Sequence, residues 1–223
     1  IEYGKRLLDA AVETDRVVAR FADGTSEEGS LLIGADGLRS RVRELIDPRA
    51  PKACHVGLLN TGGFARGITV PGEPGTAYFI FGKHCFFGYL IHPGGEVWWF
   101  ANPPSPTEPT PAELAAITPA EWRKRLLHLF REDTGPACEI IAATEQILSG
   151  WNTYDFPSVP HWRNQRMVII GDAAHAASPS SGQGASMAVE DAVVLAQCLR
   201  DVPVLSEALA TYEGLRRKRV ERV

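Results

Sequence analysis

The hydrophobic positions near the end of the chain predict a strand, a loop and a long helix. Residues 167–170 are four consecutive apolar residues that stop at Gly171, a pattern typical of a buried strand in an α/β sheet. After a loop, apolar residues recur at three- and four-residue spacing, which predicts a helix that packs this face on the sheet: Ala188, Ala192, Leu195 and Leu199. We expect the polar side chains of this helix to face outward: Glu190, Asp191 and Gln197.

Strand patterns dominate the first part of the chain. Residues 1–7 already have the pattern of a strand, and residues 16–21 lead into a turn at Asp23-Gly24. A further apolar run, residues 30–33, ends at Gly34. We therefore predict two paired strands that are joined at the Asp-Gly turn.

Short aromatic runs, broken by glycine and proline, follow between residues 52 and 101. Three of these runs predict an antiparallel meander: residues 78–81, 85–91 and 97–100. We expect most of the aromatic side chains to be core, because a sheet of this size needs large buried residues. His84, Tyr89 and His92 lie near turns and each could deprotonate a phenol, so the sequence does not select a catalytic base.

Two helix starts and two connections complete the pattern. Thr110 with Glu113 and Thr118 with Glu121 have the spacing of capping boxes, each with proline at the first helical position. Residues 102–106 predict a linker stiffened by proline, and residues 147–166 an irregular connection to the strand at 167. The chain then divides into residues 1–51, 52–149 and 150–223.

Charge and cysteine content narrow the function classes. The formal net charge of -4 and the pI near 5.9 argue against a nucleic-acid partner, which needs a basic surface. The four cysteines are widely spaced, without a histidine at metal-ligand spacing, as expected of reduced intracellular thiols. No apolar run is long enough to span a bilayer and no secretory leader is recognisable, so we expect no transmembrane segment and a cytoplasmic location.

The candidate chemistry lies where the strand at 167–170 ends. Ligands of open α/β sheets bind at the carboxyl ends of strands, and a helix amino terminus offers free N–H groups and a partial positive charge. Gly182 and Gly184 flank that terminus, and glycine lets the backbone approach a flat or anionic ligand closely. Asp172 could accept hydrogen bonds from the hydroxyls of a sugar or sugar alcohol. Each fragment alone is equally compatible with a plain turn or a flexible loop.

The complete run is more specific than its fragments. Gly171-Asp172-Ala173-Ala174-His175, then Pro179, then Gly182-Gln183-Gly184 resembles the second flavin-binding motif of FAD-dependent monooxygenases of the para-hydroxybenzoate hydroxylase type. The resemblance implies an α/β fold class, or α+β when the chain is taken as a whole. One part would belong to a Rossmann-like FAD-binding domain. Residues 52–149 would form a substrate domain with an antiparallel sheet, one face of which covers the flavin.

The resemblance also implies cofactor contacts. Gly171 lies in the motif's turn, Asp172 would hold the ribityl chain of FAD, and Pro179 would lie beside the isoalloxazine ring. The remaining contacts are N–H groups that face the ring's pyrimidine edge, around Gly182, Gln183, Gly184 and Ala185. Reduced flavin carries its negative charge on that edge, so a helix amino terminus aimed there would stabilise it.

A second stretch matches the middle motif of the same family. It runs Leu31-Leu32-Ile33-Gly34-Ala35-Asp36-Gly37, followed by Ser40 and Val42-Arg43. In the family this motif contributes to FAD pyrophosphate binding and is implicated in NAD(P)H binding. The resemblance therefore implies that Asp36 is a cofactor contact, through water, with Ser40 and Arg43 as secondary candidates.

The activity implied by the resemblance is hydroxylation of an aromatic or other electron-rich small molecule. FAD would be reduced by NAD(P)H and react with O2 to give a flavin hydroperoxide that transfers oxygen. Alternatives with the same fold are a reductase of isoprenoid type, a tryptophan halogenase, and a non-catalytic binding module. Trp98-Trp99-Phe100 does not match the halogenase run W-x-W-x-I-P. No metal site is predicted, because Asp172 and His175 lack a third ligand at suitable spacing.

The sequence also lacks one motif of the resembled family. The family's G-x-G-x-x-G turn, which holds the adenine half of FAD, is absent. Ile1 is not an initiator methionine, and residues 211–223 have a helical pattern without a stop signal. We therefore expect an interior piece of a longer protein that does not hold FAD alone. The substrate, the choice of NADH or NADPH and the oligomeric state do not follow from the sequence.

Overall fold

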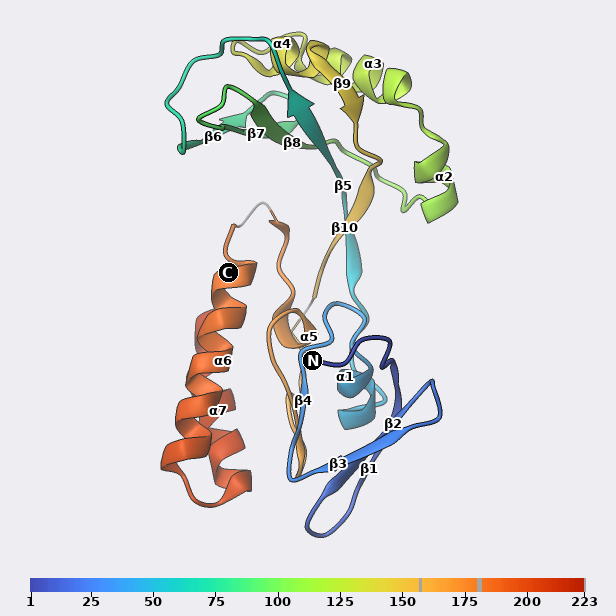
Figure 1. The fold of residues 1–223 in the computed structure, drawn as a ribbon, viewed down its shortest axis with the longest axis vertical. Helices are drawn as coiled ribbons and strands as arrows, with labels where there is room; N and C mark the ends of the chain where they lie inside the picture. The colour runs from blue at the N-terminus through green and yellow to red at the C-terminus, as the bar shows by residue number, and fades with distance from the viewer. Residues whose placement is uncertain (157, 180–181, 223) are drawn as a thin grey trace. The chain divides into compact units, whose positions relative to one another are not determined.

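The computed structural model describes residues 1–156, 158–179 and 182–222, which form two compact units (Figure 1). One unit comprises residues 1–54 and 154–223, and the other residues 55–153. Four residues lie outside the described ranges: Pro157 of the predicted connection, Ser180 and Ser181 of the predicted loop, and Val223 at the predicted helix end. No helix in the described part of the chain combines the length and the apolar character that crossing a bilayer requires.

The unit of residues 1–54 and 154–223 starts with an antiparallel sheet of order β1-β2-β3. Its strands are β1 (Leu7–Val12), β2 (Val17–Phe21) and β3 (Ser26–Gly29). The Asp23-Gly24 turn is confirmed, and Gly24 has a φ of +85°, which favours glycine. The predicted partner strand at 30–33 is wrong, because β3 pairs with β2 instead. All four residues of β3 are exposed, so no apolar pattern marks this strand in the sequence.

The apolar run at residues 30–33 belongs to a different pairing. Strand β4 (Leu32–Gly34) lies parallel to β11 (Met167–Ile169), with Met167 opposite Leu32 and Ile169 opposite Gly34. Helix α1 (Arg41–Ile46) packs directly on the end of β4, since a Cβ added at Gly34 would lie 2.6 Å from the Cβ of Val42. The two motifs identified in the sequence therefore follow two adjacent parallel strands.

Helices cover this strand pair. They are the short α5 (Asp172–His175) and the side-by-side helices α6 (Gly184–Asp201) and α7 (Leu205–Val220) (Figure 1). Tyr212 of α7 is fully buried and donates a hydrogen bond to the carbonyl of Ile169, at 3.3 Å, which ties α7 to the end of β11. Apolar residues from all these elements form one core, among them Val168, Met187, Leu195 and Leu209.

The buried positions of α6 are shifted by about one residue from the predicted ones. Its buried residues are Met187, Asp191, Leu195 and Cys198, while Ala192 is exposed. The expectation that Asp191 faces outward is wrong: its side chain is fully buried. The physical reason is a set of hydrogen-bond partners on other elements, described below, which offset the cost of burying a charge.

The unit of residues 55–153 is built around an antiparallel sheet of order β10-β5-β8-β7-β6, with β9 also paired to β5. Its strands are β5 (Cys54–Ala65), β6 (Ala77–Phe81), β7 (Phe86–Ile91), β8 (Val97–Asn102), β9 (Thr144–Ile147) and β10 (Trp151–Asp155). The predicted meander is confirmed as β6, β7 and β8. Its helices are α2 (Pro111–Ala116), α3 (Pro119–Phe130) and α4 (Ala137–Ala142).

Both predicted helix starts are present in this unit. Thr110 and Glu113 exchange the two hydrogen bonds of a capping box. At α3 only half of the box forms, since Thr118 accepts from the backbone N–H of Glu121. Helix α3 buries Trp122, Leu126 and Phe130.

The aromatic side chains divide between the two faces of the sheet. Phe87, Tyr89 and Trp99 are buried in a core with α3 and α4, as predicted. The alternate positions face the other way, and Phe79, Phe81 and Trp98 are 58%, 86% and 42% exposed. The expectation that most aromatics are core is therefore wrong for this second face, because residues one apart on a strand point to opposite sides.

Candidate functional site

A cavity of about 580 Å³ lies beyond the carboxyl end of β11, where the chain turns into α5 and later into α6. Six residues of the sequence-predicted site line it: Gly171, Asp172, Pro179, Gly182, Gly184 and Ala185. Ala35 and Gly37, from the loop that follows β4, line it as well. The structure thus brings the two predicted motifs together at one cavity. Gln183 and Asp36 do not line it.

Two turns in the lining require glycine. Gly171 has φ +57° and ψ -140°, and Gly182 has φ +64°, a region that L side chains rarely adopt. Gly184 is different, because its backbone is helical. Among the described residues, a Cβ added there would have only the Asp172 carboxylate nearby, at 4.0 Å, so no described atom crowds this face of Gly184.

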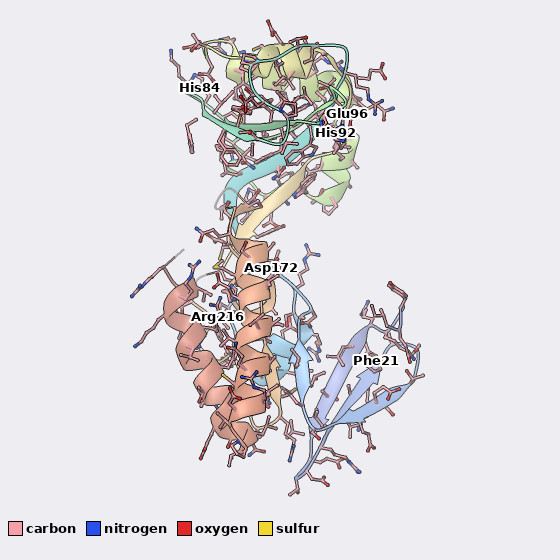
Figure 2. The ribbon with its side chains drawn as sticks, turned by 60° about the vertical axis from the view of Figure 1, so that its left-hand side comes forward. Phe21, His84, His92, Glu96, Asp172 and Arg216 are labelled. Carbon is pink, nitrogen blue, oxygen red and sulfur yellow. The ribbon has the colours of Figure 1, made fainter. Side chains whose placement is uncertain are left out.

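The polar groups at the cavity are an acidic side chain and a helix end. The Asp172 side chain is exposed at the amino-terminal end of α6 (Figure 2), and its carboxylate has no hydrogen-bond partner among the described residues. No side chain among the described residues caps the 18-residue helix α6, which starts at Gly184, and this helix end carries a partial positive charge. This cavity can therefore accept hydrogen bonds at one point and stabilise negative charge at another.

Behind the cavity lies a buried polar cluster centred on Asp191. One carboxylate oxygen accepts from the N–H of Gly171 at 2.8 Å and lies 2.5 Å from Nε2 of His175. The other accepts from Nε of Arg216 on α7 at 2.6 Å. Burial alone would raise the pKa of Asp191, but the hydrogen bonds from His175, Arg216 and Gly171 hold the pKa below its usual range.

Arg216 is itself nearly enclosed, at 5% exposure. Its Nη1 donates to Glu190 at 2.6 Å, and its Nη2 to the carbonyl of Met187 at 3.3 Å. The guanidinium thus reaches two residues of α6 besides Asp191. Burial lowers the pKa of Arg216, yet these acidic partners raise it overall.

The middle motif forms a second set of contacts. The Asp36 carboxylate accepts from the Ser40 hydroxyl at 2.5 Å and from the backbone N–H groups of Arg41 and Val42 at 2.7 and 3.1 Å. Ser40 accepts in turn from the N–H of Arg43, as the N-cap of α1. In this structure Asp36 and Ser40 therefore organise the start of α1. Asp36 also borders a separate cavity of about 640 Å³, together with the basic residues Lys5, Arg6, Arg39 and Arg41.

Arg43 connects the two motifs. Its guanidinium donates to the carbonyls of Ala173 and Leu38, both at 2.9 Å, and lies 4.3 Å from the centroid of the Phe156 ring. Burial lowers the pKa of this guanidinium. The residue does not line the 580 Å³ cavity but links the helix that follows β11 to the loop that follows β4.

The comparisons with known proteins agree with this arrangement. The whole chain, residues 1–223, matches a family described as the FAD binding domain. The chain belongs to this FAD-binding domain family. Its relatives include the 6-hydroxynicotinate 3-monooxygenase of Pseudomonas fluorescens, 29% identical over 99% of this chain and 58% of that protein. The aurachin C monooxygenase/isomerase of Stigmatella aurantiaca is 33% identical over 92% of this chain and 51% of that protein.

Solved structures share this fold. The Klebsiella pneumoniae protein HpxO, in complex with FAD and uric acid, superimposes with a TM-score of 0.84 at 28% identity, covering 97% of this chain and 55% of that one. The fold is also shared with the 2,6-dihydroxypyridine-3-hydroxylase of Arthrobacter nicotinovorans, with a TM-score of 0.79 at 18% identity, over 98% of this chain and 61% of that one. This FAD-binding domain chain spans about half the length of the curated relatives it matches.

Sequence reasoning missed two residues of this FAD-binding domain site, Asp191 and Arg216. An acidic residue in the middle of an apolar helix was a usable signal for the first. Arg216 belongs to the basic run 216–219, which is typical of a solvated helix end. Its partner is 25 positions away on another helix, a distance at which sequence spacing gives no guidance.

Proposed function

We propose that the intact protein is an FAD-dependent monooxygenase that uses NAD(P)H and O2 to hydroxylate an aromatic or other electron-rich small molecule. The observation that carries this proposal is the glycine-lined cavity at the end of β11, with the exposed Asp172 carboxylate beside the amino terminus of α6. The names of relatives support it, among them the 6-hydroxynicotinate 3-monooxygenase and an FAD-dependent urate hydroxylase.

The cavity's residues fit FAD. A carboxylate with no partner in the part of the chain that the structure describes can accept hydrogen bonds from the ribityl hydroxyls, the role proposed for Asp172. The open face of Gly184 leaves space for a flat ring, next to the N–H groups at the start of α6. Pro179, Gly182 and Ala185 complete the proposed contacts at the ring. The positive end of α6 would stabilise negative charge at the ring edge.

Several proposed contacts lie away from this cavity. Gln183 is proposed through its backbone, at the N-cap of α6. Asp36 is proposed through water, from its position at the 640 Å³ cavity. The Arg6 and Arg39 guanidinium groups at that cavity have no partner among the described residues, and we propose that they meet phosphate groups of FAD or NAD(P)H.

The redox chemistry would come from the cofactor: FAD accepts hydride from NAD(P)H and activates O2. We propose that residues 1–54 and 154–223 bind FAD and that residues 55–153 bind the substrate. The open aromatic face of the sheet supports the second role, since Phe79, Phe86 and Phe100 form a chain of ring contacts with centroids 5.6 Å apart. Such a face suits a flat, apolar ring. The cytoplasmic location stays a prediction.

The activity is tested on the intact protein purified with its cofactor. The flavin is identified from the absorbance spectrum, and oxygen uptake is then measured with NADH or NADPH against a panel of hydroxylated aromatic and heteroaromatic compounds. We expect substrate-stimulated uptake and a product that is heavier by one oxygen atom. Bound FAD without turnover would favour a binding module. Turnover without oxygen in the product would favour a reductase, and a halide-dependent product a halogenase.

The site is tested by Asp172→Ala. Loss of a charge-assisted hydrogen bond should weaken FAD binding by about 1.5–3 kcal/mol, a rise of roughly 10- to 150-fold in the dissociation constant. Titration of the apoprotein with FAD, followed by flavin fluorescence, measures this constant. Asp201→Ala is the matched control, because it removes an exposed carboxylate from the opposite end of α6. An unchanged constant in Asp172→Ala would contradict the proposed site.

A further inference from the structure

The buried cluster around Asp191 joins three separate segments of the chain. Gly171 lies in the turn after β11, Asp191 in the middle of α6, and Arg216 near the end of α7. Neither Asp191, His175 nor Arg216 lines the 580 Å³ cavity. The turn that the cluster holds does line it, since Gly171 and Asp172 are both lining residues.

The contact to Gly171 controls where the next residue points. Gly171 adopts φ +57° and ψ -140°, and its N–H is directed at the Asp191 carboxylate at a distance of 2.8 Å. A buried N–H without an acceptor is costly, so removal of this acceptor favours a different turn. Asp172 follows directly and begins α5, so a changed turn moves its carboxylate relative to the cavity.

His175 holds the other end of the same short helix. Its side chain is only 9% exposed, and Nε2 lies 2.5 Å from the same carboxylate oxygen that accepts from Gly171. Both ends of α5 are therefore connected to one atom of Asp191. Arg216 occupies the second oxygen and compensates the buried charge.

We propose that Asp191, with Arg216 as its counter-charge, is a positioning residue that sets the FAD affinity of this site through Gly171, His175 and Asp172. The proposal rests on the proposed function, in which Asp172 contacts FAD. It makes α7 part of the cofactor site although no residue of α7 lines the cavity. Asp191 acts on FAD only through Asp172 and its turn, so the effects of changing the two aspartates must not be independent.

The experiment is a double-mutant cycle on the intact apoprotein, read as the FAD dissociation constant. Its variants are Asp172→Ala, Asp191→Asn and the two combined. We expect Asp191→Asn to raise the constant about tenfold or more in the wild-type background, and by about threefold or less when Asp172 is already alanine. Glu213→Gln is the matched control, because it removes a partly buried ion-pair partner from α7 that contacts Arg163 and Arg217 but not the turn.

Stability is controlled separately, because Asp191→Asn removes one of the two acidic partners of the buried Arg216 and leaves only Glu190 of that pair. Asp191→Leu/Arg216→Met removes both charges and should raise the thermal unfolding midpoint of the apoprotein above that of Asp191→Asn, yet leave FAD binding weak, since leucine offers no acceptor to Gly171 or His175. If Asp191→Asn does not fold, this double variant replaces it in the double-mutant cycle, alone and combined with Asp172→Ala.

The outcomes separate the two proposals. A normal FAD constant in Asp172→Ala overturns the proposed site and this inference with it. If Asp172→Ala weakens FAD but the folded Asp191 variants bind it normally, only the positioning role is overturned. An equally large Asp191 effect with and without Asp172 also overturns it, because the effect would then not pass through Asp172.

Discussion

Gly171→Ala tests the turn that places the cavity directly after β11. The residue combines φ +57° with ψ -140°, a region of backbone space that is essentially restricted to glycine. The added methyl group also meets a neighbour, because an ideal Cβ at Gly171 lies 3.0 Å from the Cβ of Ala188 on α6. Both effects oppose the native turn, so we expect a loss of stability.

The size of this loss follows from the two terms. A side chain held in such a backbone region costs about 1–3 kcal/mol. The contact with Ala188 adds to this cost unless α6 moves away by a few tenths of an ångström. In a protein of about 150–250 residues, each kcal/mol lowers the unfolding midpoint by about 2–4 °C, so the expected decrease is roughly 2–12 °C.

The assay is thermal and urea unfolding of the apoprotein, so that cofactor binding does not contribute. Gly214→Ala is the matched control: Gly214 lies inside α7, and apart from the helix itself no atom of the described residues is within 4 Å of an added Cβ. This control should stabilise the protein by about 0.4–1 kcal/mol, since alanine suits a helix interior better than glycine. Equal stability changes in the two variants, or a neutral Gly171→Ala, would refute the conformation assigned to this turn.

Three further predictions concern the site and its surroundings. Gly184→Val should reduce the flavin-to-protein absorbance ratio with little loss of stability, because its side chain would enter the open space beside Asp172; normal flavin content would show that the ring lies elsewhere. Burial raises the pKa of the Cys85 thiol to about 12, so iodoacetamide at pH 8 should label the exposed Cys54 and not Cys85, as read by peptide mass spectrometry. The Asp191 pKa is lowered in the folded state despite its burial, so its contribution to stability is present above its ordinary pKa of about 4 and is lost as pH falls below that value. Urea midpoints measured from about pH 6 to 3 should therefore fall more steeply in the wild type than in Asp191→Asn, and parallel curves would contradict this.

Local patterns in the sequence determined much of the fold. The apolar run before Gly171 and the helical spacing after Gly184 predicted β11 and α6, and the Thr110 capping box predicted the start of α2. These features succeed because strands, helix caps and tight turns are decided by residues within a few positions of each other. Six of the contact residues predicted from the motif at residues 171–185 line one cavity in the structure.

The partners of each element were decided only by the tertiary structure. Residues 32–34 pair with 167–169, more than 130 positions away, and not with the hairpin strand beside them in sequence. Asp36, a predicted cofactor contact, has both carboxylate oxygens engaged at the start of α1. Which face of the aromatic sheet is covered likewise depends on where α3 and α4 pack.

Asp191 shows the physical reason most directly. Periodicity gives a helix an apolar stripe, but the edge of that stripe depends on what the neighbouring elements offer. A buried carboxylate is stable only where donors surround it, and these donors come from Gly171, His175 and Arg216 on other segments. The sequence determined that α6 has an inward face, and only the packing of α7 and the turn after β11 decided that an aspartate belongs on it.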